Sequence, residues 1–210
     1  MGSAVTWNLE EQLLASGAVQ LRPHEPFQWS SGLKAPIYCD HRSLLGVPEI
    51  RTHIGEGLAQ LVTPYHPSMI AGTSTAGIPW GMLVAQQLSL PFVYVRPEPK
   101  AHGLGRQVEG QSCQGQSVVL IEDLISTGSS SLRCVEALRK EGARVQSVIA
   151  IFNYGLPSSQ IAFDQHQVEL KTLGNFENLL LYASSTFTPE AIASLKAWQQ
   201  NPHEWSAQHG

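Results

Sequence analysis

Two adjacent carboxylates, Glu122 and Asp123, separate an apolar run from a loop of small hydroxyl residues. The apolar run, residues 118–121, is typical of a fully buried strand. Residues 126–131 contain only Ser and Thr around Gly128. Small side chains let a ligand approach the backbone, and a helix starting there adds N–H groups and a positive dipole end. The loop therefore suits a phosphate and the carboxylates suit sugar hydroxyls, which together indicate a site for a phosphorylated ribose.

Other phosphate-binding motifs fit this chain less well. A Walker A loop needs a Lys after its last glycine, and none follows Gly128. A dinucleotide-binding fingerprint needs G-x-G-x-x-G, but Gly103, Gly105 and Gly110 have another spacing and follow no strand-to-helix turn. The remaining alternative is an ordinary strand-to-helix turn capped by serines.

The elements that must position these residues alternate along the chain. Apolar periodicity with N-caps, Gly and Pro predicts helices over 8–17, 48–63, 77–88, 132–141 and 188–200. Apolar runs predict strands over 69–72, 92–95, 118–121, 145–152 and 167–173. Residues 18–47 should form short strands and turns, and the last few residues should fray. This alternation predicts the α/β class, with a central parallel sheet covered by helices on both faces.

Composition sets limits on size, partners and compartment. A chain of 210 residues fits one domain, and its net charge of −4 gives no reason to expect nucleic acid or a membrane as a partner. The cysteines are three in number and far apart (Cys39, Cys113, Cys134), which fits neither a disulfide framework nor a zinc site. With no signal-peptide pattern and no long apolar window, we expect a cytoplasmic protein.

Four segments resemble motifs of one enzyme family. Residues 118–131 resemble the phosphoribosyl-diphosphate motif of type I phosphoribosyltransferases. Within that family, residues 95–103 with 108–110 resemble the mobile catalytic loop of orotate phosphoribosyltransferases. Residues 27–40 with Arg42 resemble their hood over the pyrimidine, and residues 71–79 resemble their diphosphate-binding loop. The matches fall in the family's order and cover most of residues 9–155.

The resemblance implies a fold and an activity. The fold would be one type I phosphoribosyltransferase domain over residues 1–210, with a core at about 68–155 and a hood from about 1–47 plus C-terminal elements. The enzyme would transfer the phosphoribosyl group of 5-phosphoribosyl 1-diphosphate to N1 of orotate, a step of pyrimidine biosynthesis. Orotidine 5′-monophosphate and diphosphate would be the products. A homodimer is implied, in which the lid reaches the neighbouring active site. Mg²⁺ would be held by substrate oxygens, with few or no direct protein ligands.

Residue roles follow from the same resemblance. Glu122 and Asp123 would hold the ribose hydroxyls, Thr75 and Ala76 would contact the diphosphate through the main chain, and Arg96 would anchor it. Lys100 and His102 would close over it from the lid. The residues implied around the 5-phosphate are Leu124, Ile125, Ser126, Thr127, Gly128, Ser129 and Ser130. Those implied for orotate are Ser30, Lys34, Tyr38, Ser126 and Tyr154, with a packing role for Tyr154 equally open.

The expected lid is the polar stretch at residues 97–116. Breaking the bond from the anomeric carbon to diphosphate leaves negative charge on the leaving group, so cations and exclusion of water would favour it. Arg96, Lys100 and His102 supply cations at the end of an expected strand, where ligands bind open α/β sheets. An isolated cluster of this kind would be a solvated basic loop.

The lid departs from the fuller pattern of many relatives. Pro97 stands in place of a second basic residue and Ala101 in place of an Asp, and Ala76 replaces a Lys that some relatives carry. Pro97 and Pro99 should stiffen the base of the lid, because proline fixes φ. We therefore expect a variant catalytic loop with fewer cations.

Two rival functions share parts of these patterns. A purine phosphoribosyltransferase shares the acidic motif, but the hood and lid segments disfavour it. A regulator that senses phosphoribosyl diphosphate would need a DNA-binding domain, and the roughly 26 residues before Phe27 are too few for one.

The remaining aromatic and histidine residues have simpler predicted roles. Four tryptophans are expected to serve packing: Trp7, Trp80, Trp198 and Trp205. Five histidines lack metal-ligand spacing and are expected on the surface: His24, His41, His53, His66 and His166.

Overall fold

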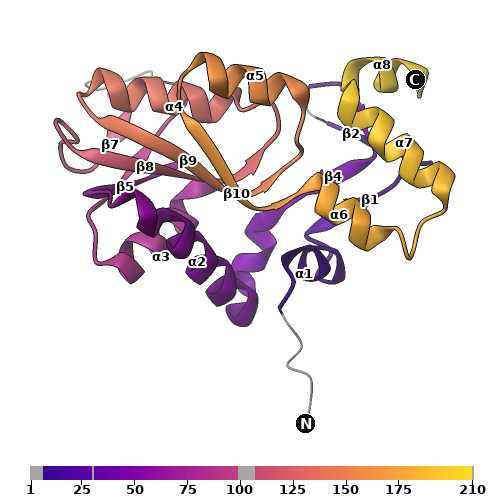
Figure 1. The fold of residues 1–210 in the computed structure, drawn as a ribbon, viewed down its shortest axis with the longest axis horizontal. Coiled ribbons are helices and arrows are strands. Elements are labelled where there is room, and N and C mark those ends of the chain that lie inside the picture. The colour runs from indigo at the N-terminus through magenta and orange to yellow at the C-terminus, as the bar shows by residue number, and fades with distance from the viewer. Residues whose placement is uncertain (1–6, 30, 99–106, 210) are drawn as a thin grey trace, which may run out of the picture.

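A six-stranded sheet forms the centre of the computed structural model, which describes residues 7–29, 31–98 and 107–209. Its strand order is β10-β9-β8-β5-β6-β7 (Figure 1). The strands are β5 (Met69–Thr73), β6 (Phe92–Val95), β7 (Val108–Glu109), β8 (Ser117–Ile125), β9 (Arg144–Asn153) and β10 (Glu169–Asn175). All neighbouring pairs are parallel except β6 with β7, which is antiparallel.

Helices cover both faces of this sheet, as predicted. One face packs against α2 (Pro48–Val62) and α3 (Gly77–Leu88), and the other against α4 (Ser129–Lys140) and α5 (Pro157–Gln165) (Figure 1). Because side chains alternate along a strand, Val119 and Ile121 of β8 join the first core while Val118 and Leu120 join the second. Burial on both faces explains why the strands are apolar without a break.

Short elements gather at one end of the sheet, and we call them the hood. They include two antiparallel pairs, β1 (Val19–Leu21) with β4 (Ile37–Cys39) and β2 (Phe27–Gln28) with β3 (Lys34–Ala35). Around them lie α1 (Leu9–Ala15), the 3-10 helix η1 (His41–Gly46), α6 (Phe176–Ala183), α7 (Pro189–Gln200) and α8 (Pro202–Gln208) (Figure 1). A second 3-10 helix, η2 (Thr63–Tyr65), follows α2. Among the described helices, none is long and apolar enough to cross a membrane.

The chain end is ordered, so the predicted fraying is wrong. Asn201 accepts a hydrogen bond from the Glu204 N–H and Pro202 occupies the first turn, so the proline expected to follow the last helix begins α8 instead. Trp205 is buried, with 3% of its surface exposed, and its Nε1 donates to Ser194 Oγ at 3.1 Å. The Lys34 N–H donates to Ser206 Oγ at 2.9 Å, which attaches α8 to β3.

Three further elements differ from the sequence prediction. The strand predicted over 118–121 continues to Ile125, so the acidic pair lies within β8 rather than after it. The pairing of β9 with β8 extends the strand, because Leu124 and Ile125 lie opposite Phe152 and Asn153. Helices α5 and α6 were not predicted. The helix α5 has weak amphipathic patterning, and its residues Ser159 and Phe163 are buried.

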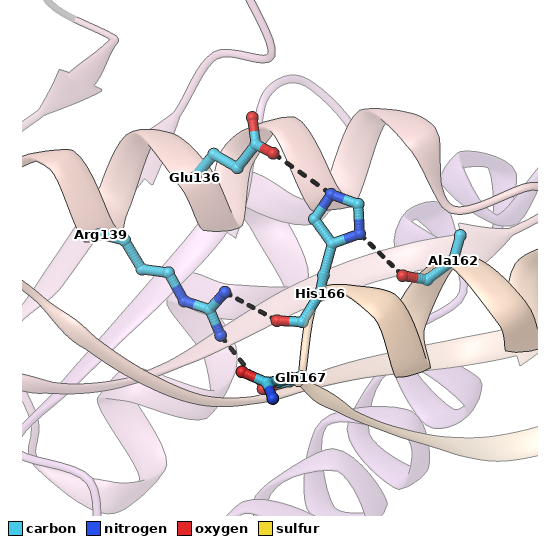
Figure 2. A network of polar contacts seen from close by, with 5 residues as sticks. All are labelled: Glu136, Arg139, Ala162, His166 and Gln167. Carbon is cyan, nitrogen blue, oxygen red and sulfur yellow. Dashed lines mark hydrogen bonds and ion pairs between the residues drawn. The ribbon is translucent and has the colours of Figure 1, made fainter.

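A polar cluster joins the two helices on one face. Arg139 of α4 donates to the main-chain carbonyls of His166 and Gln167, at 2.8 and 3.2 Å (Figure 2). The His166 ring bonds the Ala162 carbonyl at 2.7 Å and lies 3.2 Å from Glu136 of α4 (Figure 2). These contacts cap the C-terminal end of α5, where carbonyl groups lack helical partners.

Glycine permits a close approach between α3 and the sheet. A Cβ on Gly77 would overlap Thr73 Oγ1 and the Ile121 carbonyl oxygen. A Cβ on Gly72 of β5 would lie 2.7 Å from the Gly77 oxygen. The absence of side chains at both positions brings the start of α3 directly against the end of β5 and against Ile121 within β8.

Candidate active site

The predicted site residues follow four neighbouring parallel strands at the same edge of the sheet. Arg96 follows β6, Thr75 follows β5, residues 126–130 follow β8, and Tyr154 follows β9. The chain passes from β5 to β6 on one side and later to β8 on the other, so β5 lies at a switch in strand order. Open α/β sheets bind ligands at the carboxyl edge beside such a switch.

The two acids differ in burial and in their partners. Glu122 is 6% exposed, and its carboxylate accepts from Ser131 Oγ of α4 at 3.0 Å and from the Asp123 N–H at 3.0 Å. Burial, together with the charge of Asp123, raises the pKa of Glu122 to about 8. The Thr73 hydroxyl and the Asp123 N–H, which donate to the carboxylate, oppose that rise. Glu122 is thus an internal acid beneath the loop.

Asp123 is half-buried and interacts electrostatically with a group of hood and core residues, Cys39, His41 and Tyr154. Burial raises the pKa of the Cys39 thiol to about 12, although a hydrogen bond with Tyr154 opposes this. Burial also raises the pKa of Tyr154 well above its usual value and lowers the pKa of His41. These three groups around Asp123 therefore remain neutral at neutral pH, whereas Arg42 adds a positive charge that also acts on it.

The loop after β8 presents an open helix N-terminus. Gly128 has φ +79° as the N-cap of α4, and no side chain caps the helix there. A Cβ at Gly128 would lie 2.5 Å from Phe163, so glycine is required by both backbone and space. Thr127 Oγ1 and Ser129 Oγ are exposed and 3.0 Å apart. Uncapped N–H groups beside two hydroxyls form a suitable cradle for a phosphate.

The flanking residues of this loop contribute differently. Ser126 is half-buried and Ser130 is exposed, whereas Ile125 is buried in the core with Leu124 packed against it. The Ile125 carbonyl accepts from the Tyr154 N–H at 3.0 Å. Leu124 and Ile125 therefore hold the loop in place, and a ligand would meet their main chain rather than their side chains.

The loop between β5 and α3 lies next to the end of β6. The Ser74–Thr75 peptide bond is cis, and the Ser74 N–H donates to the Val95 carbonyl at 2.7 Å. Thr75 is exposed and Ala76 is half-buried. These residues precede the α3 N-terminus, whose cap residue Ala76 makes no side-chain hydrogen bond. A second open helix N-terminus thus faces the same edge.

The base of the predicted lid is a short hairpin. Tyr94 and Val95 pair with β7, and the Arg96 N–H donates to the Gln107 carbonyl at 2.9 Å. The Arg96 Nε lies 3.7 Å from Glu109 Oε1, and its guanidinium lies 5.8 Å from the centre of the Tyr94 ring. The lid residues Lys100 and His102 lie outside the described residues.

The hood residues predicted to bind orotate have varied environments. The Lys34 Nζ donates to the His209 carbonyl at 2.7 Å, so this cation is held by the C-terminal segment. Tyr38 is 40% exposed with its ring 5.5 Å from Phe27. Tyr154 is buried, stacked on Trp29 at 5.7 Å and against the edge of Trp198, which favours the packing role. Ser30 lies outside the described residues.

Comparisons with known proteins identify the family of the chain. The family model "Phosphoribosyl transferase domain" matches residues 42–178. The orotate phosphoribosyltransferase of Listeria innocua is 47% identical over 199 residues, covering 93% of this chain and 95% of that protein. The chain belongs to the orotate phosphoribosyltransferase family.

Solved structures place the fold in the same family. The orotate phosphoribosyltransferase of Aeropyrum pernix superposes with a TM-score of 0.75 at 31% identity, over 86% of this chain and all of that one. The UMP synthase of Leishmania donovani gives a TM-score of 0.77 at 25% identity, over 91% of this chain and 41% of that one. The type I phosphoribosyltransferase fold inferred from four short motifs is confirmed.

The sequence analysis of this orotate phosphoribosyltransferase family member did not predict a place for His41 near the site. The expectation of a surface position is wrong, because the His41 ring has no exposed surface. The one available signal was its position between Asp40 and Arg42, inside the hood motif. Trp80, Trp198 and Trp205 are buried as predicted, while Trp7 is half-buried and stacks on His53 at 5.0 Å.

Proposed function

We propose that this chain is an orotate phosphoribosyltransferase, which transfers the phosphoribosyl group of 5-phosphoribosyl 1-diphosphate to N1 of orotate. The products are orotidine 5′-monophosphate and diphosphate, in the biosynthesis of UMP. The observation that carries this proposal is 47% identity over 93% of the chain to an enzyme of that name. The open phosphate cradle beside Asp123 supports it chemically.

In the proposed mechanism, the loop at residues 126–130 holds the 5-phosphate of the substrate. Its N–H groups, the α4 dipole and the hydroxyls of Thr127 and Ser129 supply the contacts. Asp123 holds the ribose hydroxyls with Glu122 supporting it from beneath, and the negative charge of Asp123 stabilises the cationic sugar as its bond to diphosphate breaks. The accessible position of Asp123 supports giving it the larger share of this role.

Cations and N–H groups meet the departing diphosphate. The main chain at Thr75 and Ala76, ahead of α3, approaches it from the sheet. Arg96 holds it at the lid base, while Lys100 and His102 close over it and exclude water. Arg96 must exchange its contact with Glu109 for the diphosphate, because the two side chains lie within 3.7 Å.

Orotate lies between the hood and the phosphate loop. We assign contacts with it to Ser30, Lys34, Tyr38 and Ser126, with Tyr154 beneath them. Lys34 is the cation suited to the orotate carboxylate, once its Nζ exchanges the His209 carbonyl for that group.

Magnesium enters this proposal with the substrate. Among the described residues, no three His, Cys, Asp or Glu side chains gather in a way that could hold a metal ion. Glu122 is buried and neutral, which leaves Asp123 as the only carboxylate of the pair able to approach a substrate-held cation. Bound Mg²⁺ would neutralise charge on the diphosphate.

We further propose a cytoplasmic homodimer in which each lid serves the neighbouring site. Val47 and Met82, beside and within the α2–α3 layer, expose 39% and 44% of their surfaces, which supports an apolar contact there. The three cysteines are unpaired, which suits a reducing compartment.

A nucleobase panel tests the proposed activity. The protein is incubated with 5-phosphoribosyl 1-diphosphate, Mg²⁺ and one base at a time, and diphosphate release is measured. Orotate should support release, while adenine, hypoxanthine and guanine should not. Release with a purine and none with orotate would overturn the proposal, and binding of phosphoribosyl diphosphate without release with any base would favour a sensor.

A further inference from the structure

His41 is a fully buried histidine beside the acidic pair. Its ring has no exposed surface, and its centre lies 6.1 Å from that of the Phe152 ring in β9. Neither Nδ1 nor Nε2 has a hydrogen-bond partner among the residues that the structure describes. An unpaired polar group in a dry environment costs about 1–3 kcal/mol, so its presence requires an explanation.

The imidazole lies beside the end of β8, because Phe152, whose ring is its neighbour, pairs with Leu124 of that strand. Asp123 and Asp40 both act on the pKa of His41 through their negative charges, Asp123 from β8 and Asp40 from directly before η1. Burial lowers the pKa of His41 despite these two carboxylates, so the ring is neutral and carries one N–H at neutral pH. A neutral donor therefore lies next to the ribose-binding acid.

We propose that His41 is a positioning residue, which sets the orientation of Asp123 for the ribose hydroxyls by donating its ring N–H to that residue in the ligand-bound state. This inference rests on the proposed function of Asp123. This role would couple the hood to the sugar site through η1, because a shift of the hood would move the His41 ring away from Asp123 of β8.

A packing role predicts the opposite response to substitution. Phenylalanine keeps a flat aromatic side chain without an N–H, but its ring is larger than imidazole, so at this buried position its loss of stability is measured separately from its kinetics. If His41 only fills space, a folded His41→Phe should keep the kinetics of the wild type. If it positions Asp123, a folded His41→Phe should have impaired use of the ribose substrate whatever its thermal stability.

The test compares steady-state kinetics and thermal unfolding of the full-length wild type and His41→Phe. We expect kcat/KM for 5-phosphoribosyl 1-diphosphate to fall about tenfold or more, as for loss of a hydrogen bond to a charged group. The KM for orotate should stay within about twofold of wild type, because its proposed contacts do not include His41. Unchanged kinetics in a folded Phe variant would overturn the proposal.

Donor rescue separates hydrogen bonding from shape. The amide of His41→Asn approximates the position of Nδ1, and that of His41→Gln approximates Nε2. Recovery of at least part of the lost kcat/KM by one of them supports the proposal and identifies the nitrogen. If the Phe variant does not fold, His41→Met, which is flexible and lacks a donor, takes its place. Equal loss in the Asn, Gln and donor-free variants would contradict the proposal.

A matched control and a binding measurement complete the design. Leu44 is buried in the same η1, so Leu44→Val should lower the unfolding midpoint while leaving kcat/KM unchanged. Calorimetric binding of ribose 5-phosphate reports on the sugar site without turnover. If the wild type binds it but releases no diphosphate with orotate, the proposed activity fails. If His41→Phe binds it as tightly as the wild type, the positioning role fails.

Discussion

Adjacent residues of the acidic pair have different environments because they lie within a strand. Side chains of neighbouring strand residues point to opposite faces, so Glu122 reaches Ser131 under α4 while Asp123 faces His41 and the hood. One acid is consequently buried and neutral, and the other is accessible. Two carboxylates with contrasting environments commonly divide their roles in an active site.

Asp123→Asn should lower turnover strongly while preserving the fold. The amide keeps the shape but removes the charge that stabilises the cationic sugar, a loss of about 2–4 kcal/mol in the barrier. Steady-state kcat and circular dichroism measure the two effects. Asp164→Asn, on the outside of α5, is the control and should behave like the wild type. Full turnover in a folded Asn variant would refute the role given to Asp123.

Glu122 should make stability depend on pH in a defined window. Its pKa is raised in the folded state to about 8 from an ordinary value of 4.5, so the folded protein binds more protons between these values. Glu122 therefore adds to the free energy of unfolding in full below about pH 4.5, and this added stability is lost as the pH rises through about 8.

Glu122→Gln tests this directly, because its Oε1 can accept from the Asp123 N–H and its Nε2 can donate to Ser131 Oγ, and neither group titrates. Urea unfolding at several pH values between 5 and 8.5 should show the Gln variant gaining stability relative to wild type as the pH rises. A constant difference between the two proteins would show that Glu122 does not titrate in this window.

At the scale of elements, the close packing of α3 on the sheet positions the diphosphate loop. Gly77→Ala should destabilise the fold by about 1–3 kcal/mol, because the new Cβ overlaps Thr73 Oγ1 and the Ile121 carbonyl. The shift of α3 should also raise the KM for 5-phosphoribosyl 1-diphosphate. Urea unfolding and kinetics give the two values.

Gly55→Ala in α2 is the matched control. Its Cβ would meet Leu83 at an ordinary 3.6 Å, and alanine in a helix interior should stabilise by roughly 0.5–1 kcal/mol. If the two substitutions changed the free energy of unfolding by similar amounts, the close contact at Gly77 would not be the reason that glycine is needed there.

At the scale of the whole molecule, a shared active site predicts complementation between inactive chains. Lys100→Ala impairs the lid and Asp123→Asn impairs the sugar site. If the lid serves the neighbouring subunit, a mixed dimer has one site with both lesions and one with none. Random mixing should then restore roughly a quarter of wild-type activity, since about half the dimers are mixed.

The mixing experiment needs subunits that exchange, which differential tagging and pull-down establish beforehand. A lid acting on its own subunit leaves each site with one lesion, so activity would not recover. Exchange without recovery would eliminate the shared site and leave the enzymatic activity of the single subunit in place.

The α/β class, the main strands and helices, and the family could all be predicted from local patterns along the chain. Strands buried on both faces need continuous apolar runs, and a phosphate loop needs small residues at fixed positions, so both leave local patterns in residues 69–153. These local requirements are readable without knowledge of the neighbours. The role of Gly128 follows from such a requirement, since its positive φ and the nearby Phe163 exclude larger residues.

The contacts between residues that are distant in sequence could be read only from the folded chain. The extension of β8 through the acidic pair depends on pairing with β9, a partner distant in sequence. The burial of His41 depends on the hood folding over the sheet, and the order of α8 depends on Trp205 and Ser206 contacting distant segments. Burial and pairing are properties of long-range contacts, and no local pattern around these residues encodes them.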